Sequence, residues 1–389
     1  MKRFSSLIIA LSVTVHGFGQ SGVLWEIEQN SPVLKAALAE LEAERIASKG
    51  ETLLANPEVE FDYLWGAENI GGRHDLRISQ SFDIPTLTGM KAGKAGNIGE
   101  MAAFKYRMER QAVLLEAKQA CIDLVYYHLM LDELGNHLEQ AAALVDSYEK
   151  RMKAGEATVL DLNKAKIHQT AIQGQINKAE AERQALLSSL RAMNGGKELD
   201  FGALIYDPDD YLPDDFETWF SKASEVNPTL GYVRKQVELE ERQVAIDKAS
   251  TLPELAVGYM SEIRTGEKFR GVTLGVNIPL WSAGNKVRES RARLTAAAER
   301  RNAAEQEFFF DLQNQYAKAR SMKENAEMML RSLRETDNRE YLLSALSRGE
   351  ISMIDYLVEI DLYYDALTAA LEAERDYRHA LASLNAFNI

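Results

Sequence analysis

The chain has 389 residues, with 45 Lys and Arg against 59 Asp and Glu, so its formal net charge is -14. No Ser/Gly-rich or Pro-rich linker divides it, which favours one elongated unit over two or three separate domains. The acidic balance disfavours nucleic acid as a partner, because phosphate backbones attract basic surfaces. The single cysteine, Cys121, excludes an intramolecular disulfide and carries no metal-binding spacing.

Residues 1–20 have the layout of a secretory signal peptide. Met1, Lys2 and Arg3 precede an apolar run over 7–15, and small residues follow it. The alternative, a membrane anchor, is disfavoured because the run is shorter than the roughly 18 residues that span a bilayer. Later in the chain no apolar run reaches that length, which excludes a membrane protein built of helices. Spanning strands, which need only about 9 to 11 alternating residues, remain allowed.

The first half begins with a helical pattern that starts at Ser31-Pro32 and ends at Asn56-Pro57. Two strands follow, over about 57–65 and 74–85, because apolar and polar residues alternate there with period two. In the first strand, Val59, Phe61, Tyr63 and Trp65 alternate with Glu58, Glu60, Asp62 and Leu64. The pattern predicts a strand hairpin with one apolar face.

A long helical hairpin is predicted over about 89–194. Leucines seven residues apart mark one face of its first arm, which at about 1.5 Å per residue would extend roughly 90 Å. The chain reverses at Gly155, a helix C-cap, and Thr158 is the N-cap of the returning helix. Residues 195–215 form a loop-like connecting segment.

The second half repeats this order. A helix starting at Asn227-Pro228 precedes strands over about 253–263 and 268–280, and a helical hairpin spans about 284–387. Its first arm is expected to be continuous to about residue 346, and its turn contains Gly349. Residues separated by 194 or 196 positions correspond: Pro32 with Pro228, Pro57 with Pro253, Pro85 with Pro279, Gly155 with Gly349, and Asp161 with Asp355. The spacing indicates two structural repeats, over 21–194 and 216–389.

Four strands cannot close into a barrel, and open edges in a membrane would leave backbone groups unpaired. The chain is therefore expected to oligomerise. Three chains would supply twelve strands for a closed β-barrel and enough long helices for a coaxial α-helical tube. The fold class predicted is mainly α with a small β part.

These features together resemble the TolC-like outer-membrane efflux factors. The resemblance rests on the signal peptide, the Asn-Pro-bounded strand hairpins, the Ile-Pro-x-x-x-Gly starts of the long helices and the Gly-Glu turns, and it covers essentially the whole mature chain. Residues 79–85, Ser-Gln-Ser-Phe-Asp-Ile-Pro, are most similar to the heavy-metal branch, which exports cobalt, zinc and cadmium or copper. The resemblance implies a homotrimer with an outer-membrane barrel of twelve strands and a periplasmic helical barrel.

The resemblance also implies that the hairpin tips dock the adaptor and constrict the pore. The residues concerned are Arg151, Gly155, Thr158, Asp161, Arg348, Gly349, Ser352 and Asp355. Asp355 occupies the position of a gate aspartate, whereas Ile351 and Val358 replace an arginine and a carboxylate of some members, which puts a gate closed by those ion pairs in doubt. As an alternative, Asp161 and Asp355 are first-turn residues favoured by the helix dipole.

Acidic residues of the first strand, Glu58, Glu60 and Asp62, are predicted to face the lumen, where they would favour cations. The alternative is the ordinary placement of polar residues toward water. The histidines show no ligand spacing, so no metal site and no cofactor are predicted. Residues 89–95 lack the glycine spacing and the Ser or Thr of a phosphate loop, and no Gly-x-Ser-x-Gly motif occurs, so an enzyme is not expected.

The predicted function is an exit duct in the outer membrane of a Gram-negative bacterium, for metal ions or small toxic compounds. Its expected partners are two further copies of the chain, outer-membrane lipid, a periplasmic adaptor and an inner-membrane pump, an RND pump being favoured. Two alternatives stay open: the exit duct of a type I protein secretion system, and a periplasmic coiled-coil adaptor without a channel.

Overall fold

The computed structural model describes residues 20–50, 52–66, 71–82, 85–208, 210–264, 266–278 and 283–389. The expected signal peptide, apart from its last residue, lies outside the described residues. Pro279, which the repeat pairs with Pro85, also lies outside them. Of the described helices, none is long and apolar enough to cross a membrane.

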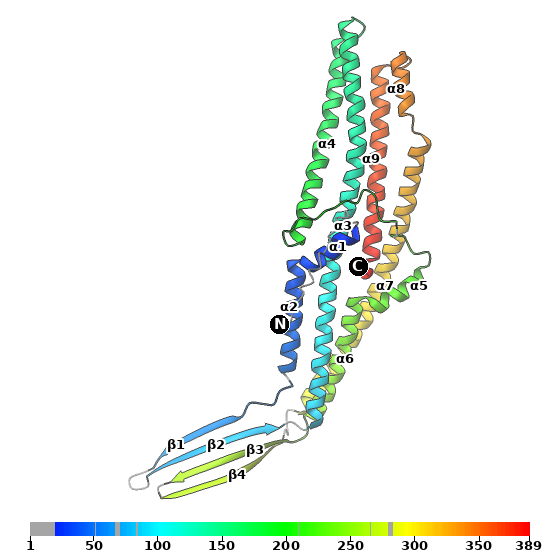
Figure 1. Ribbon diagram of the computed structural model, residues 1–389. Coiled ribbons are helices and arrows are strands. Elements are labelled where there is room, and N and C mark those ends of the chain that lie inside the picture. Colours follow the sequence, from blue (N-terminus) through cyan, green and yellow to red (C-terminus); the bar gives the residue numbers. More distant parts are fainter. Residues whose placement is uncertain are drawn as a thin grey trace, which may run out of the picture. The chain divides into compact units, whose positions relative to one another are not determined.

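The chain is mainly helical with one small sheet (Figure 1). The helices are α1 (Gln20–Asn30), α2 (Pro32–Gly50), α3 (Pro85–Lys153), α4 (Val159–Met193), α5 (Phe216–Val226), α6 (Pro228–Ala249), α7 (Ala283–Glu335), α8 (Arg339–Arg348) and α9 (Met353–Leu384). The strands are β1 (Glu58–Trp65), β2 (Gly72–Phe82), β3 (Glu254–Arg264) and β4 (Glu267–Asn277). The four strands lie where the alternation of apolar and polar residues predicts them.

The sheet is antiparallel with the order β1-β2-β3-β4. Its two hairpins are joined through β2 and β3, where Ile78 lies opposite Tyr259. Gly258 is required at this junction, because a Cβ atom there would lie 2.7 Å from both the Ile78 carbonyl oxygen and the Thr273 hydroxyl. Strands β1 and β4 form the two edges of the sheet.

The repeat extends further than the sequence patterns predict. Helix α1 and helix α5 each precede a proline-initiated helix, and both their ends are separated by 196 positions. Helix α5 begins at an Asp215 cap that accepts a hydrogen bond from the Thr218 backbone. Its aromatic face packs on α7, where Phe220 contacts Phe309 edge-on. Both helices are short, and neither was predicted.

The first helical hairpin is formed by α3, with 69 residues, and α4, with 35. Its seam buries Leu134, Ala141 and Ile172, as the heptad spacing predicts. In the second half the first arm is broken, which corrects the prediction of one helix to about residue 346. Helix α7 ends at Glu335, and α8 starts at Arg339.

The break in the second arm has a physical cause in its side chains. Asp337 accepts hydrogen bonds from both the backbone and the guanidinium of Arg339, which competes with a continuing helix. Arg339 also donates to Glu133 of α3 at 3.1 Å and lies 4.5 Å from the ring centroid of Tyr363. The break is thus fixed by contacts to neighbouring helices, which a sequence pattern cannot show.

Contacts group the chain into two compact units that each draw on both halves. One contains Met1–Val33, Ala112–Asp214 and Gln315–Ile389, and therefore both hairpin tips. The other contains Leu34–Gln111 and Asp215–Asn314, and therefore the sheet. The sequence repeats and the contact units are thus different divisions of the chain, because each contact unit combines segments of both halves.

Candidate functional site

The first hairpin tip is closed by a left-handed glycine. Gly155 has a φ of +78°, and its N–H donates to the carbonyl of Met152 at 3.1 Å. The N–H of Glu156 donates to the carbonyl of Arg151 at 2.8 Å. These two bonds form a Schellman motif, which satisfies the last carbonyls of α3. A side chain at Gly155 would meet no neighbour, so the glycine serves the backbone conformation alone.

The second tip has the same geometry 194 positions later. Gly349 has a φ of +75°, and its N–H donates to the carbonyl of Leu346 at 3.1 Å. The N–H of Glu350 donates to the carbonyl of Ala345 at 2.9 Å. The two turns are therefore structural equivalents, as the repeat predicts.

Each returning helix starts with a capping box. The Thr158 hydroxyl accepts from the Asp161 N–H at 3.2 Å, and the Asp161 carboxylate accepts from the Thr158 N–H at 3.2 Å. Ser352 and Asp355 make the same pair of bonds, both at 3.2 Å. The hydroxyl groups also donate to the carboxylates, which holds the pKa of Asp161 and of Asp355 below the ordinary aspartate value. Both carboxylates are thus ionised and held in place locally, Asp355 at an exposed position and Asp161 at a half-buried one.

The arginines of the two tips have different partners. The Arg151 guanidinium lies 5.1 Å from the ring centroid of Tyr148, whereas Arg348 pairs with Glu350 at 2.8 Å. Arg348 is therefore bound to its own turn. Ile351 packs against the apolar cluster below the tips.

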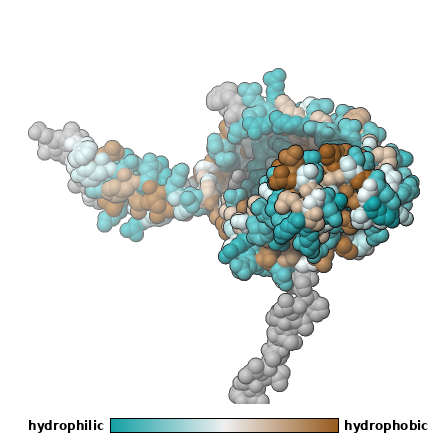
Figure 2. Space-filling model, turned by 90° about the horizontal axis from the view of Figure 1, so that it is seen from above, coloured by the Kyte–Doolittle hydropathy of each residue, from teal (hydrophilic) through white to brown (hydrophobic). Residues whose placement is uncertain are grey.

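An apolar cluster joins the two hairpins beneath the tips. Its buried members are Leu144, Tyr148, Leu162, Ala165, Leu346, Met353, Tyr356, Ile360 and Tyr364. Other apolar side chains of this end, such as Leu160, Ile354 and Val358, remain exposed. Viewed onto the tips, apolar surface accordingly lies beside hydrophilic surface (Figure 2). The single chain leaves this surface uncovered.

The sheet presents one charged face and one apolar face. Glu60 pairs with Arg77 at 2.8 Å, and Asp62 lies opposite Asp75, which pairs with Arg73 at 2.7 Å. Glu58 is exposed beside them. The arginines of β2 offset part of the acidic charge predicted from β1 alone. On the other face, Val59, Phe61, Trp65, Val272 and Leu274 are exposed.

Solved structures share this architecture. The CmeC outer-membrane channel of Campylobacter jejuni is 14% identical, with a TM-score of 0.75 over 95% of this chain and 85% of its own. A membrane protein of Pseudomonas aeruginosa has 14% identity and a TM-score of 0.77, covering 95% and 92%. CusC, described with transmembrane channel formation, has 14% identity and a TM-score of 0.75, covering 95% and 91%. No family profile and no curated protein matches the sequence.

The chain has the TolC-like fold of outer-membrane channels. The resemblance stated from the residue patterns is confirmed at the level of the fold. The two tips lie at the ends of the helical hairpins of this fold, and the sheet supplies its β part.

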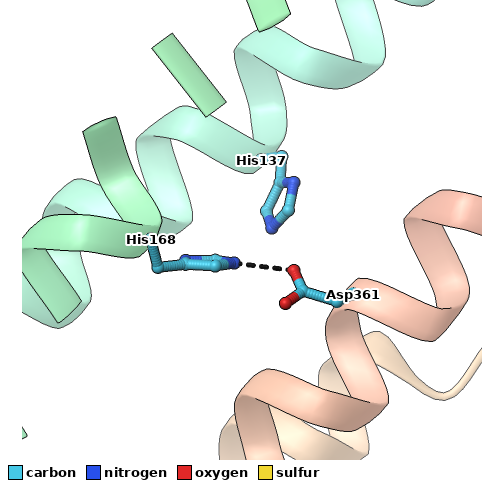
Figure 3. A group of neighbouring side chains, drawn as sticks. All are labelled: His137, His168 and Asp361. Carbon is cyan, nitrogen blue, oxygen red and sulfur yellow. Dashed lines mark hydrogen bonds and ion pairs between the residues drawn. The ribbon is translucent and has the colours of Figure 1, made fainter. Parts of the chain in front are cut away.

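The TolC-like fold also brings together three residues that the sequence patterns do not connect. His137 of α3, His168 of α4 and Asp361 of α9 each point a potential ligand atom into one gap (Figure 3). The His168 Nε2 and Asp361 Oδ1 atoms are 2.9 Å apart. Burial lowers the pKa of His137 to about 3, with smaller contributions from His168 and Arg339, so its imidazole is neutral. Because the residues come from three helices, ligand spacing along the sequence gives no signal for them.

Proposed function

We propose that this chain is the outer-membrane exit duct of a tripartite efflux system and works as a homotrimer. The protein itself performs no chemistry. It provides a passage from the periplasm through the outer membrane, and its role is set by assembly and by opening at the hairpin tips.

The observation that carries this proposal is the four-stranded sheet, which is incomplete as a single unit. Its apolar face is exposed along β1 and β4, and those strands are also its two edges. Exposed strand edges and a wide apolar face are unfavourable in water and, for open edges, also in lipid. Three copies would join β1 of one to β4 of the next and close a barrel of twelve strands, with the charged face toward the lumen.

The hairpin tips are the proposed docking and gating surface. Support comes from their equivalent turns, the ionised Asp161 and Asp355, and the exposed apolar residues nearby. A periplasmic adaptor would cover that apolar surface. Since Arg348 already pairs with Glu350, closure by an ion pair between Arg348 and Asp355 within one chain is not supported.

The proposed partners are those that the resemblance implies. A periplasmic adaptor would connect the tips to an inner-membrane pump, with an RND pump as the favoured type. The proposed cargo is metal ions or small toxic compounds. The Ser79-to-Pro85 residues, which resemble the heavy-metal branch, support a metal cargo without distinguishing it from other substrates.

The test combines fractionation with transport. The mature protein is expected in outer-membrane fractions as a trimer that conducts ions in planar bilayers. A deletion strain should become sensitive to zinc, cobalt, cadmium, copper or silver, or to dyes and antibiotics. Recovery of a water-soluble monomer would overturn the duct proposal, and sensitivity to organic compounds alone would overturn a metal cargo.

A further inference from the structure

The group formed by His137, His168 and Asp361 has the composition of a transition-metal site. It offers two imidazole nitrogens and one carboxylate oxygen, all within 4.8 Å of one another. Imidazole and carboxylate ligands suit Zn²⁺ and similar divalent ions, whereas Mg²⁺ and Ca²⁺ prefer oxygen alone. One ring nitrogen of His137 points toward the gap between the other two residues (Figure 3).

The burial of the imidazoles supports this interpretation. The His137 residue is only 3% exposed, and neither of its ring nitrogens has a hydrogen-bond partner among the described residues. The Nδ1 atom of His168 is also buried without such a partner. Buried polar atoms of this kind are uncommon, because each loses its hydration without compensation. A metal ion would give the His137 lone pair a partner.

Packing fixes the orientation of His137. Its ring stacks on Tyr364 with centroids 3.6 Å apart and planes tilted by only 8°. The His168 ring meets it edge-on, with centroids 5.0 Å apart. Asp361 completes the group from a largely exposed position, with 55% of its side chain accessible. The two imidazoles are therefore held by the fold, and the carboxylate has room to adjust.

We propose that His137, His168 and Asp361 bind one divalent transition-metal cation, of which Zn²⁺ is the model, and thereby connect the first helical hairpin to α9. Ligands about 2.0–2.1 Å from a tetrahedral ion are about 3.4 Å from one another, whereas these ligand atoms lie within 4.8 Å, so the most distant pair must approach by roughly an ångström. The exposed Asp361 side chain can supply that movement. A water molecule would take the fourth position.

The same unit contains a matched control. His379 of α9 and Asp123 of α3 form a pair at 2.8 Å, similar to the 2.9 Å of His168 and Asp361. Among the described residues no third ligand joins His379 and Asp123 in such a group. The control pair should therefore bind a metal ion far more weakly.

The experiment uses the full chain, purified without a histidine tag and stripped of metal with a chelator. Zn²⁺ is titrated by calorimetry at pH 7.5, and Co²⁺ serves as a spectroscopic probe through its visible absorption. One ion per chain is expected, with the absorption of a four-coordinate site. Since the bound state is the folded state, Zn²⁺ should also raise the thermal midpoint.

Variants H168Q and D361N should each weaken Zn²⁺ binding by at least tenfold, and H379Q should leave it unchanged. D361N alters an exposed position without changing its size, so it tests the site even if H168Q fails to fold. No binding by the wild type, unchanged binding in D361N, or an equal loss in H379Q would overturn the proposal. The readout is binding, so it is independent of whether the chain is an efflux duct.

Discussion

The left-handed glycines of the two tips have a measurable energetic role. Replacing Gly155 or Gly349 with Ala should favour opening of the turn by about 1 kcal/mol, a factor of roughly five, because a Cβ atom is disfavoured at positive φ. Hydrogen exchange of the tip amides measures this. Gly174→Ala is the control, since that site lies within α4 and has open space. The Gly174→Ala substitution should instead disfavour local opening, because Ala stabilises a helix relative to Gly. Equal changes in hydrogen exchange at the tip glycines and at Gly174 would contradict a role for the left-handed conformation.

The tip carboxylates predict how the caps respond to acid. Hydrogen bonds from Thr158 and Ser352 lower the pKa of Asp161 and Asp355 below the ordinary value of 3.8. Their stabilisation is therefore complete above that value and is lost as the pH falls through the lowered pKa. The protection of the tip amides against hydrogen exchange, corrected for intrinsic exchange rates, should stay constant from neutral pH to about 5. It should decrease below about pH 4. D161N and D355N should remove this decrease, and a decrease that persists in both would count against the capping role.

The tips and the histidine group differ in how far the sequence predicts them. A Gly C-cap followed by Thr158 or Ser352 is a local signal, so turn geometry and cap partners follow from a few neighbouring residues. His137 and His168 are 31 positions apart on different helices, and Asp361 comes from the other half of the chain. Their meeting depends on how the helices align, which no short motif encodes.

Among the elements, the break between α7 and α8 depends on Arg339. Its guanidinium binds Asp337 and Glu133 and lies over Tyr363, with its side chain 24% exposed. Arg339→Ala should favour local opening of residues 336–348 by about 2 kcal/mol, because it leaves charged partners unpaired. The increase in hydrogen-exchange rate of the amides of residues 336–348 measures this opening. The control Arg348→Ala removes an exposed pair and should change opening by less than about 0.5 kcal/mol. Similar effects for both would refute the role of Arg339.

Element prediction succeeded where periodicity is strong. The alternation in β1 and β3 and the heptads of α3 locate these elements, because one face of each is apolar. The sequence patterns do not predict α1 and α5, because each helix has only 11 residues, too few to show a clear period. The break at Asp337 was missed because apolar residues continue on both sides of it, and the interruption depends on contacts made by Arg339.

At the scale of the whole molecule, the two faces of the sheet should respond differently to an added charge. Phe61→Arg places a cation on the face proposed to meet lipid and should reduce assembly by about 2–4 kcal/mol if the site is near the membrane centre. Ser79→Arg adds the same charge on the opposite face, beside Glu58, and should be tolerated. The two variants are compared by the yield of trimer extracted from outer membranes. Equal yields would contradict a lipid-facing Phe61.

The order of helices and strands is predictable from the duplication of the chain, because prolines and glycines that end these elements recur 194 or 196 positions apart. The same information does not determine the contact units, which combine parts of both halves. Nor does it determine how many chains assemble. Oligomerisation is inferred from the two edge strands of the sheet, β1 and β4, whereas the number three is what the resemblance implies.

The break between α7 and α8 has a consequence for symmetry. Helix α3 passes the equivalent region without interruption, so the two halves differ there although their turns agree. Six equivalent hairpins would give a tube a sixfold axis. In a trimer of this chain, however, broken and continuous arms would alternate, and only the threefold axis would be strict. Three of the six hairpins would then carry the break, and the continuous hairpins between them would have no equivalent of the Arg339 contacts.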